Sequence, residues 1–219
     1  MAPPGGEVCE ISVLFVDVRG FTSLAERLAP AEVAQRLNRF YALASEAIFK
    51  YDGTLDKFVG DQVMAFFGAP LHAKDHPQRA VRVALLILEG MSKVAQGAPF
   101  DPAQDRPFDP AQDRPFDSAQ DRSFDNTQDK LLRVGAGIAS GQAFVGNVGA
   151  GAVTDYTVLG DTVNVAARLQ GAAASGEILV TEETYRHVES EFPDAPGREL
   201  ELKGKSEPVH ARVIVLPRT

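Results

Sequence analysis

The chain has 219 residues, of which 44% are hydrophobic and 24% charged, which suits a single globular domain with a substantial core. Its formal net charge of −8 disfavours general nucleic-acid binding, because an acidic chain repels phosphodiester backbones. The single cysteine, Cys9, excludes an intrachain disulfide. The N-terminus has no basic stretch and no apolar run approaches membrane-spanning length, so we expect no signal peptide, no membrane segment and a cytoplasmic protein.

Hydrophobic periodicity and turn residues predict the secondary structure in chain order. We expect strands at 11–18, 54–59, 62–68, 132–139, 142–148, 178–180, 199–203 and 209–216, and helices at 21–28, 30–51, 77–95, 161–173 and 182–189. In the first helix, Ser23 and Glu26 have capping-box spacing, with Thr22 as a second candidate cap. Ser140-Gly141 predicts a turn between the strands on either side of it.

Residues 100–130 do not follow this pattern and repeat with a period of eight, as in FDPAQDRP. The segment has eight aspartates against three arginines and one lysine, and only one bulky apolar residue in each repeat. Such a composition cannot bury enough surface to offset its ordering entropy. We therefore expect a disordered insertion in a single domain that spans 1–219, with its core at about 11–216. A partner-docking or metal-binding role for the insertion is the alternative.

The order strand, helices, strand, strand, helix, strand matches the split βαβ plan of a ferredoxin-like α+β fold, with C-terminal strand and helix additions. Right-handed crossovers make the strands at 11–18 and 54–59 parallel, with the strand at 62–68 antiparallel between them. The end of the first strand then lies beside the turn at Gly60-Asp61. Asp17 and Asp61 are therefore predicted to be neighbours in space.

Two carboxylates at strand ends, with glycines beside them, suit Mg²⁺, which prefers a few hard oxygen ligands from protein. Gly20, Phe21 and Thr22 follow Asp17 and begin a helix, where free backbone N–H groups can hold phosphate oxygens. Metal and anion-binding groups in one turn indicate a triphosphate site. The alternative is a pair of solvated turn aspartates, which are common.

Five segments in this order resemble the successive motifs of the class III adenylate/guanylate cyclase family. They are FVDVRGFTSL, LDKFVGDQVMAFFG, GIASGQAFVGNVG, DYTVLGDTVNVAARL and ELKGKSEPV. The resemblance runs from about residue 11 to 216, except for the repeat insertion. It implies a dimer with active sites at the subunit interface.

The resemblance assigns the metal and purine positions. Asp17 and Asp61 resemble the two metal-binding aspartates, and Val18 would offer its backbone carbonyl to one metal. Lys57, four residues before Asp61, matches the purine-selecting lysine. Thr157 occupies the second purine-selecting position, where many members have aspartate. Threonine there resembles a subgroup that responds to bicarbonate, which makes bicarbonate a further expected ligand.

The resemblance also assigns the groups around the ribose and phosphates. Asn164 and Arg168 match the ribose-orienting asparagine and the transition-state arginine. They lie one helical turn apart, so both project from one helix face. An exposed asparagine and arginine on an amphipathic helix are also ordinary, and residue type alone does not separate the two interpretations. Lys203 resembles a phosphate-contacting lysine, with Lys205 as the alternative.

The expected activity is conversion of ATP to 3′,5′-cyclic AMP and pyrophosphate with two Mg²⁺ or Mn²⁺ ions, by a homodimer. Lys57 favours ATP because an ammonium can donate to adenine N1, whereas guanine carries a hydrogen there. Thr157 does not decide the base, because a hydroxyl both donates and accepts. The alternatives are a guanylate cyclase, a cyclase-like sensing or dimerisation module, and a diguanylate cyclase, whose GGDEF signature is replaced here by VGDQ.

Overall fold

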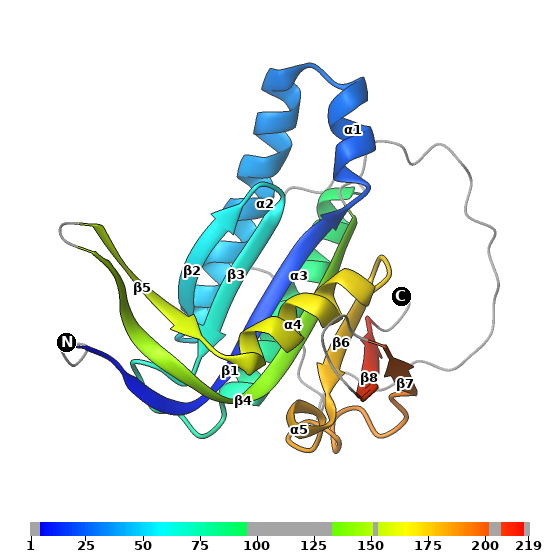
Figure 1. Ribbon diagram of the computed structural model, residues 1–219. Helices are drawn as coiled ribbons and strands as arrows, with labels where there is room; N and C mark the ends of the chain where they lie inside the picture. The colour runs from blue at the N-terminus through cyan, green and yellow to red at the C-terminus, as the bar shows by residue number, and fades with distance from the viewer. Residues whose placement is uncertain (1–4, 96–132, 151–152, 202–206, 217–219) are drawn as a thin grey trace.

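The computed structural model describes residues 5–95, 133–150, 153–201 and 207–216 (Figure 1). The expected insertion at 100–130 and the two candidate phosphate lysines, Lys203 and Lys205, lie outside these ranges. Within the described ranges, no helix combines the length and the apolar character needed to cross a membrane.

Eight strands and five helices make up the described fold, which is a mixed α+β architecture. The strands are β1 (Glu7–Arg19), β2 (Thr54–Val59), β3 (Gln62–Phe67), β4 (Arg133–Ala150), β5 (Val153–Leu159), β6 (Glu177–Thr181), β7 (Gly197–Leu200) and β8 (Val209–Val215). The helices are α1 (Phe21–Arg27), α2 (Pro30–Lys50), α3 (His76–Ala95), α4 (Asp161–Ala172) and α5 (Glu182–Tyr185).

The sheet has the order β2-β3-β1-β4-β6-β8-β7, with β5 paired to β4 outside this path. β3 runs antiparallel to both β1 and β2, which makes β1 and β2 parallel with β3 between them. This is the predicted split βαβ arrangement. It brings the end of β1 beside the β2–β3 turn, as the crossover rule requires.

Alternate residues of β1 enter two separate cores. Leu14 and Val16 pack with α2 and α3 on one face of the sheet. Val13 and Phe15 pack with α4 on the other face (Figure 1). Because side chains alternate along a strand, Asp17 belongs to the same face as Val13 and Phe15. The first candidate metal ligand therefore faces α4.

Helix α4 packs very close to the sheet at Gly137 of β4. A Cβ atom at this position would overlap the backbone nitrogen of Gln170 and the carbonyl oxygen of Ala166. Only glycine permits this approach, because any larger residue would push the helix away. Gly137 thus determines how deeply the Gln170 side chain reaches toward the end of β1.

The turn predicted at Ser140-Gly141 is wrong, because β4 runs unbroken from Arg133 to Ala150. Residues 133–145 pair with the whole of β1, and residues 144–150 pair with β5, a strand that the sequence did not reveal. Ser140 lies directly across from Ser12, and their hydroxyls are 2.6 Å apart. This partly buried pair of hydroxyls explains why a serine stands in the middle of the strand, although serine is more usual in turns.

The side-chain caps predicted for the first helix are also wrong. Gly20 occupies the N-cap position in the left-handed conformation (φ 71°), and no side chain caps the helix. Thr22, Ser23 and Glu26 all lie inside α1. Since glycine adopts positive φ without strain, it turns the chain sharply out of β1 and begins the helix at once. Helix α5 and strand β7 are also shorter or shifted relative to the predicted ranges.

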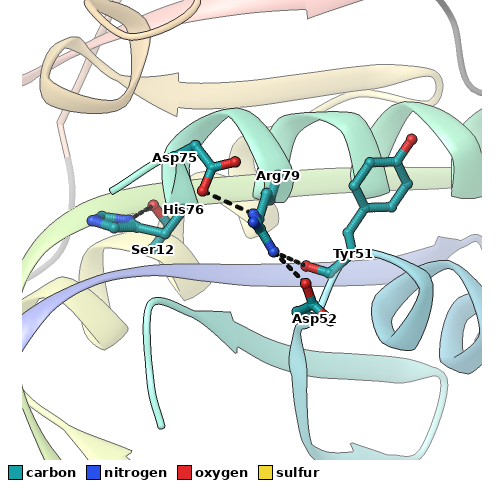
Figure 2. A network of polar contacts seen from close by, with 6 residues as sticks. All are labelled: Ser12, Tyr51, Asp52, Asp75, His76 and Arg79. Atoms are coloured by element: carbon teal, nitrogen blue, oxygen red, sulfur yellow. Dashed lines mark hydrogen bonds and ion pairs between the residues drawn. The ribbon is translucent and has the colours of Figure 1, made fainter. Parts of the chain in front are cut away.

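Polar contacts join α3 to β1 and to the residues that follow α2, as Figure 2 shows. Arg79 of α3 bonds to Asp75 at 2.9 Å and to Asp52 at 2.6 Å, where the chain leaves α2. His76, at the start of α3, accepts or donates a 2.8 Å hydrogen bond with Ser12 of β1. These contacts attach α3 to both α2 and β1, and so support the strand that carries Asp17.

Candidate active site

Asp17 and Asp61 are adjacent, as the strand order predicted. Asp17 lies opposite Gln62 in the β1–β3 register, and the N–H of Val18 donates to the Asp61 carbonyl oxygen at 3.1 Å. Burial raises the pKa of Asp17 to about 6, and repulsion from the Asp61 carboxylate and a hydrogen bond with it act in the same direction. A bound divalent cation would relieve this repulsion, so the pair has the electrostatics of a metal site.

Gln170 holds the Asp17 carboxylate in place, and sequence reasoning missed it. Its Nε2 donates to Asp17 Oδ2 at 2.9 Å, and its Oε1 accepts from Gln62 Nε2 at 2.9 Å. Gln170 is 4% exposed on α4, although glutamine is usually a surface residue. This hydrogen bond lowers the pKa of Asp17 and thus opposes the effect of burial. A polar residue within the apolar face of α4 was the only available signal.

Arg19 also lies next to Asp17 on the α4 face of β1. Its Nη1 is 3.6 Å from Asp17 Oδ2, and its Nη2 donates to the backbone carbonyl of Gln170. The guanidinium charge lowers the pKa of Asp17 as well. Arg19 and Gln170 therefore connect the candidate metal ligand to the C-terminal turn of α4.

The candidate phosphate-binding residues directly follow this carboxylate. Gly20, Phe21 and Thr22 form the junction between β1 and α1. The first hydrogen bond of the helix runs from the N–H of Leu24 to the carbonyl of Gly20 at 3.1 Å. The amides before Leu24 have no partner of this helical type, as at any helix start. They lie within a few residues of Asp17, where a metal-bound phosphate would be.

The two candidate purine-selecting residues meet at a third residue, Asp56 of β2. Thr157 of β5 donates from Oγ1 to Asp56 Oδ2 at 2.5 Å. Lys57 Nζ lies 3.2 Å from Asp56 Oδ1. The structure thus brings together Lys57 and Thr157, which are far apart in the sequence. Sequence reasoning missed Asp56, because β5 and the contact of its Thr157 with β2 were not predicted.

Asn164 and Arg168 lie on α4 away from its buried face. Asn164 is exposed and Arg168 is half-buried, whereas Val165, Ala166 and Leu169 are buried against the sheet. Gln170 and Arg168 thus extend from different sides of one helix. The same helix contacts Asp17 of its own chain through Gln170 and presents Asn164 and Arg168 away from the sheet.

A second group of potential metal ligands lies at the opposite end of β1. Glu7, Cys9 and His72 have ligand atoms within 4.8 Å of one another. Burial and the carboxylates of Glu7 and Glu10 raise the pKa of the Cys9 thiol, which disfavours the metal-binding thiolate. His72 and Glu7 already form an ion pair at 3.3 Å. Eight residues of extended strand, roughly 26 Å, separate Cys9 from Asp17.

The α+β fold, the paired acidic residues near the end of β1 and the candidate base-selecting residues on β2 and β5 agree with a nucleotide cyclase type of domain. The family model described as the adenylate and guanylate cyclase catalytic domain matches residues 6–213, and the chain belongs to this family.

Solved structures agree with this membership. The adenylyl cyclase CyaB from P. aeruginosa has a TM-score of 0.74 at 33% identity, with 97% of each chain covered. The guanylyl cyclase Cya2 has a TM-score of 0.75 at 28% identity, with 95% of this chain and 93% of that chain covered. Because one of these structures is an adenylyl cyclase and the other a guanylyl cyclase, the similarity identifies the family but does not decide whether the substrate base is adenine or guanine.

Among curated proteins, Adenylate cyclase 1 of Rhizobium meliloti (strain 1021) is 35% identical over 164 residues, covering 74% of this chain and 20% of that protein. An adenylate cyclase of Anabaena cylindrica is 29% identical over 222 residues, covering 95% of this chain and 39% of that protein. The chain thus spans about one fifth to two fifths of the length of these curated relatives.

Proposed function

We propose that this domain is an adenylate cyclase that converts ATP to 3′,5′-cyclic AMP and pyrophosphate. The observation that carries the proposal is the pairing of Asp17 and Asp61, whose burial and mutual repulsion raise the pKa of Asp17 to about 6. A bound cation would offset this repulsion and favour the charged form of both carboxylates. Membership of the cyclase family supplies the reaction class.

The donor set fits two Mg²⁺ or Mn²⁺ ions. Asp17 and Asp61 supply hard carboxylate oxygens, and the Val18 carbonyl would supply a backbone oxygen beside them. When bound, the ions lower the pKa of the ribose 3′ hydroxyl and neutralise the triphosphate. Gln170 and Arg19 hold the Asp17 carboxylate in position through the contacts described above.

The remaining candidate residues act on the nucleotide. The 3′ oxygen attacks the α-phosphorus, the bond to the bridging oxygen breaks, the hydroxyl proton is released and pyrophosphate leaves. Arg168 stabilises the charge that develops on the α-phosphoryl oxygens, and Asn164 orients the ribose. The amides of Gly20, Phe21 and Thr22 hold phosphate oxygens. Lys203 is the further phosphate contact implied by the resemblance.

The choice of ATP rests on Lys57, whose ammonium donates to the unprotonated N1 of adenine and opposes the N1–H of guanine. The names of two relatives, the Rhizobium and Anabaena adenylate cyclases, support the same base. GTP is the second candidate substrate, because the chain is also similar to the guanylyl cyclase Cya2.

The active site is completed by a second copy of the chain. Asn164 and Arg168 project outward from α4, while Gln170 of the same helix faces Asp17. We propose that Lys57, Thr157, Asn164 and Arg168 of one subunit serve the metals of its partner. Lys57 and Asp61, four residues apart, then belong to different active sites. A bicarbonate response and a cytoplasmic location remain predictions from the sequence.

The test is product formation by the purified domain with Mg²⁺ or Mn²⁺ and either ATP or GTP. We expect cyclic AMP from ATP and a loss of about two to three orders of magnitude in rate for Asp17→Asn and Asp61→Asn. Cyclic GMP as the main product would favour the guanylate cyclase. No cyclic product from a folded dimer would favour the sensing or dimerisation module.

A further inference from the structure

Asp56 is a buried carboxylate that contacts both candidate base-selecting residues. Its side chain is only 1% exposed. One oxygen accepts from the Thr157 hydroxyl at 2.5 Å, and the other lies 3.2 Å from Lys57 Nζ. An aspartate is seldom so deeply buried without a partner for each oxygen, and here both partners are the residues proposed to contact the base.

A β-bulge puts Asp56 in this position. The β2–β3 pairing joins Leu55 to Ala65 and Lys57 to Met64, so Asp56 is the extra residue between them. A bulge turns the side chains of a strand away from simple alternation. Asp56 and Lys57 can therefore approach the same point, although they are consecutive in sequence.

The contact with Asp56 determines the hydrogen-bonding direction of Thr157. An aspartate carboxylate has only acceptor oxygens, and its second oxygen faces the Lys57 ammonium at 3.2 Å. The single hydroxyl hydrogen of Thr157 must then point at Asp56. Thr157 is 7% exposed, so water offers its hydroxyl little alternative. Toward a bound base, the Thr157 oxygen can then act only as a hydrogen-bond acceptor.

We propose that Asp56 is the residue that makes this site select 6-aminopurines. It turns the Thr157 oxygen into an obligatory acceptor and holds the Lys57 ammonium beside it as a donor. Adenine matches this pair, because its 6-amino group donates and its N1 accepts. Guanine opposes both, because its O6 accepts and its N1 carries a hydrogen. This inference rests on the proposed function for the roles of Lys57 and Thr157.

Asp56→Asn changes the direction in which the Thr157 hydroxyl points, whereas Thr157→Val removes the hydroxyl. Asp56→Asn keeps the shape of the side chain and adds an amide donor, which allows the Thr157 hydroxyl to point at the base. Sites that leave one polar group mispaired typically lose about 10- to 100-fold in discrimination. We therefore expect the ratio of kcat/KM for ATP over GTP to fall by about that factor in Asp56→Asn.

The experiment combines Asp56→Asn with Thr157→Val in a double-mutant cycle. If Asp56 acts through the hydroxyl, Asp56→Asn has no further effect on the ATP-to-GTP ratio once the hydroxyl has been removed by Thr157→Val. The control Asp155→Asn removes an exposed charge from the same strand as Thr157 and should leave the ratio unchanged. Thermal unfolding of each variant separates misfolding from altered selection.

Equilibrium binding of non-hydrolysable ATP and GTP analogues gives a second readout that does not depend on turnover. If the wild-type domain binds the ATP analogue better than the GTP analogue but forms no product, the proposed function is refuted. Analogue binding by the same variants then tests the role of Asp56. An unchanged base preference in folded Asp56→Asn would overturn the inference while the cyclase activity stands. Additive effects of Asp56→Asn and Thr157→Val would overturn it as well.

Discussion

Replacing Gln170 by methionine should weaken metal binding at Asp17 in a pH-dependent way. Methionine has a similar length and no polar nitrogen or oxygen in its side chain, so it removes the 2.9 Å hydrogen bond to Asp17 Oδ2 with little change in packed volume. The backbone carbonyl of Gln170 remains, and with it the contact to Arg19. The perturbation at Asp17 is therefore confined to one donor on one carboxylate.

The size of the effect follows from the hydrogen bond and the exposure of its acceptor. Hydrogen bonds to charged groups contribute about 1.5–3 kcal/mol, and the lower value applies because the Asp17 side chain is 23% exposed. About 1.5 kcal/mol corresponds to roughly one pKa unit. Because Gln170 lowers the pKa of Asp17, its loss should move that pKa upward from about 6.

The assay is Mn²⁺ binding by calorimetry or paramagnetic quenching at pH 6 and pH 8. Protonation of Asp17 competes with the metal, so apparent affinity falls as the pH drops through the pKa of Asp17. A shift of one unit predicts about a fivefold loss of affinity in Gln170→Met at pH 6 and almost none at pH 8. Thr162→Val, which removes an exposed 2.9 Å hydrogen bond from the same helix, should bind Mn²⁺ normally. An equal loss at both pH values would show that Gln170 does not act through the protonation of Asp17.

Two further predictions concern stability. Burial and the charge of His187 lower the pKa of His76 to about 4, so the unfolded chain binds more protons between about pH 6.5 and 4 and stability falls as the pH falls through this window. After allowance for screening by solvent, we expect the free energy of unfolding of the wild type to fall by about 1–2 kcal/mol more than that of His76→Gln between pH 7 and pH 4.5. Urea denaturation measures this difference, and parallel pH dependences of the two proteins would contradict it. Gly137→Ala should destabilise the fold by about 3 kcal/mol or more, because its Cβ overlaps the backbone of Gln170. Gly171→Ala, with open space around the new methyl group, should leave the melting temperature unchanged or raise it slightly, and equal effects of the two alanines would contradict the close packing of α4.

The proximity of the two candidate metal-binding aspartates could be predicted from sequence because it depends on strand order. Asp17 lies near the end of β1 and Asp61 in the turn between β2 and β3, and the split βαβ plan and the structure both place them side by side. Handedness and strand alternation are rules of the backbone, so they need no knowledge of side-chain packing.

The residues that support the site could not be predicted in this way. Asp56 reaches Thr157 only because β2 has a bulge and β5, paired to β4, brings Thr157 within reach of it, and neither feature has a local sequence signal. Gln170 reaches Asp17 only because Gly137 lets α4 approach the sheet. Ser140 resembles a turn residue in the sequence, because its partner Ser12 is 128 positions away. These contacts are all long-range, and propensity and periodicity describe only neighbours along the chain.

In the proposed dimer, one active site is built from two subunits, with the metal residues from one chain and the arginine from its partner. Asp17→Ala and Arg168→Ala should each be inactive as homodimers. Mixing the two proteins should restore one intact site in each heterodimer, which gives about one quarter of wild-type cyclic AMP formation when subunits exchange at random. No recovery of activity, with heterodimers shown to form by native mass spectrometry, would contradict the account.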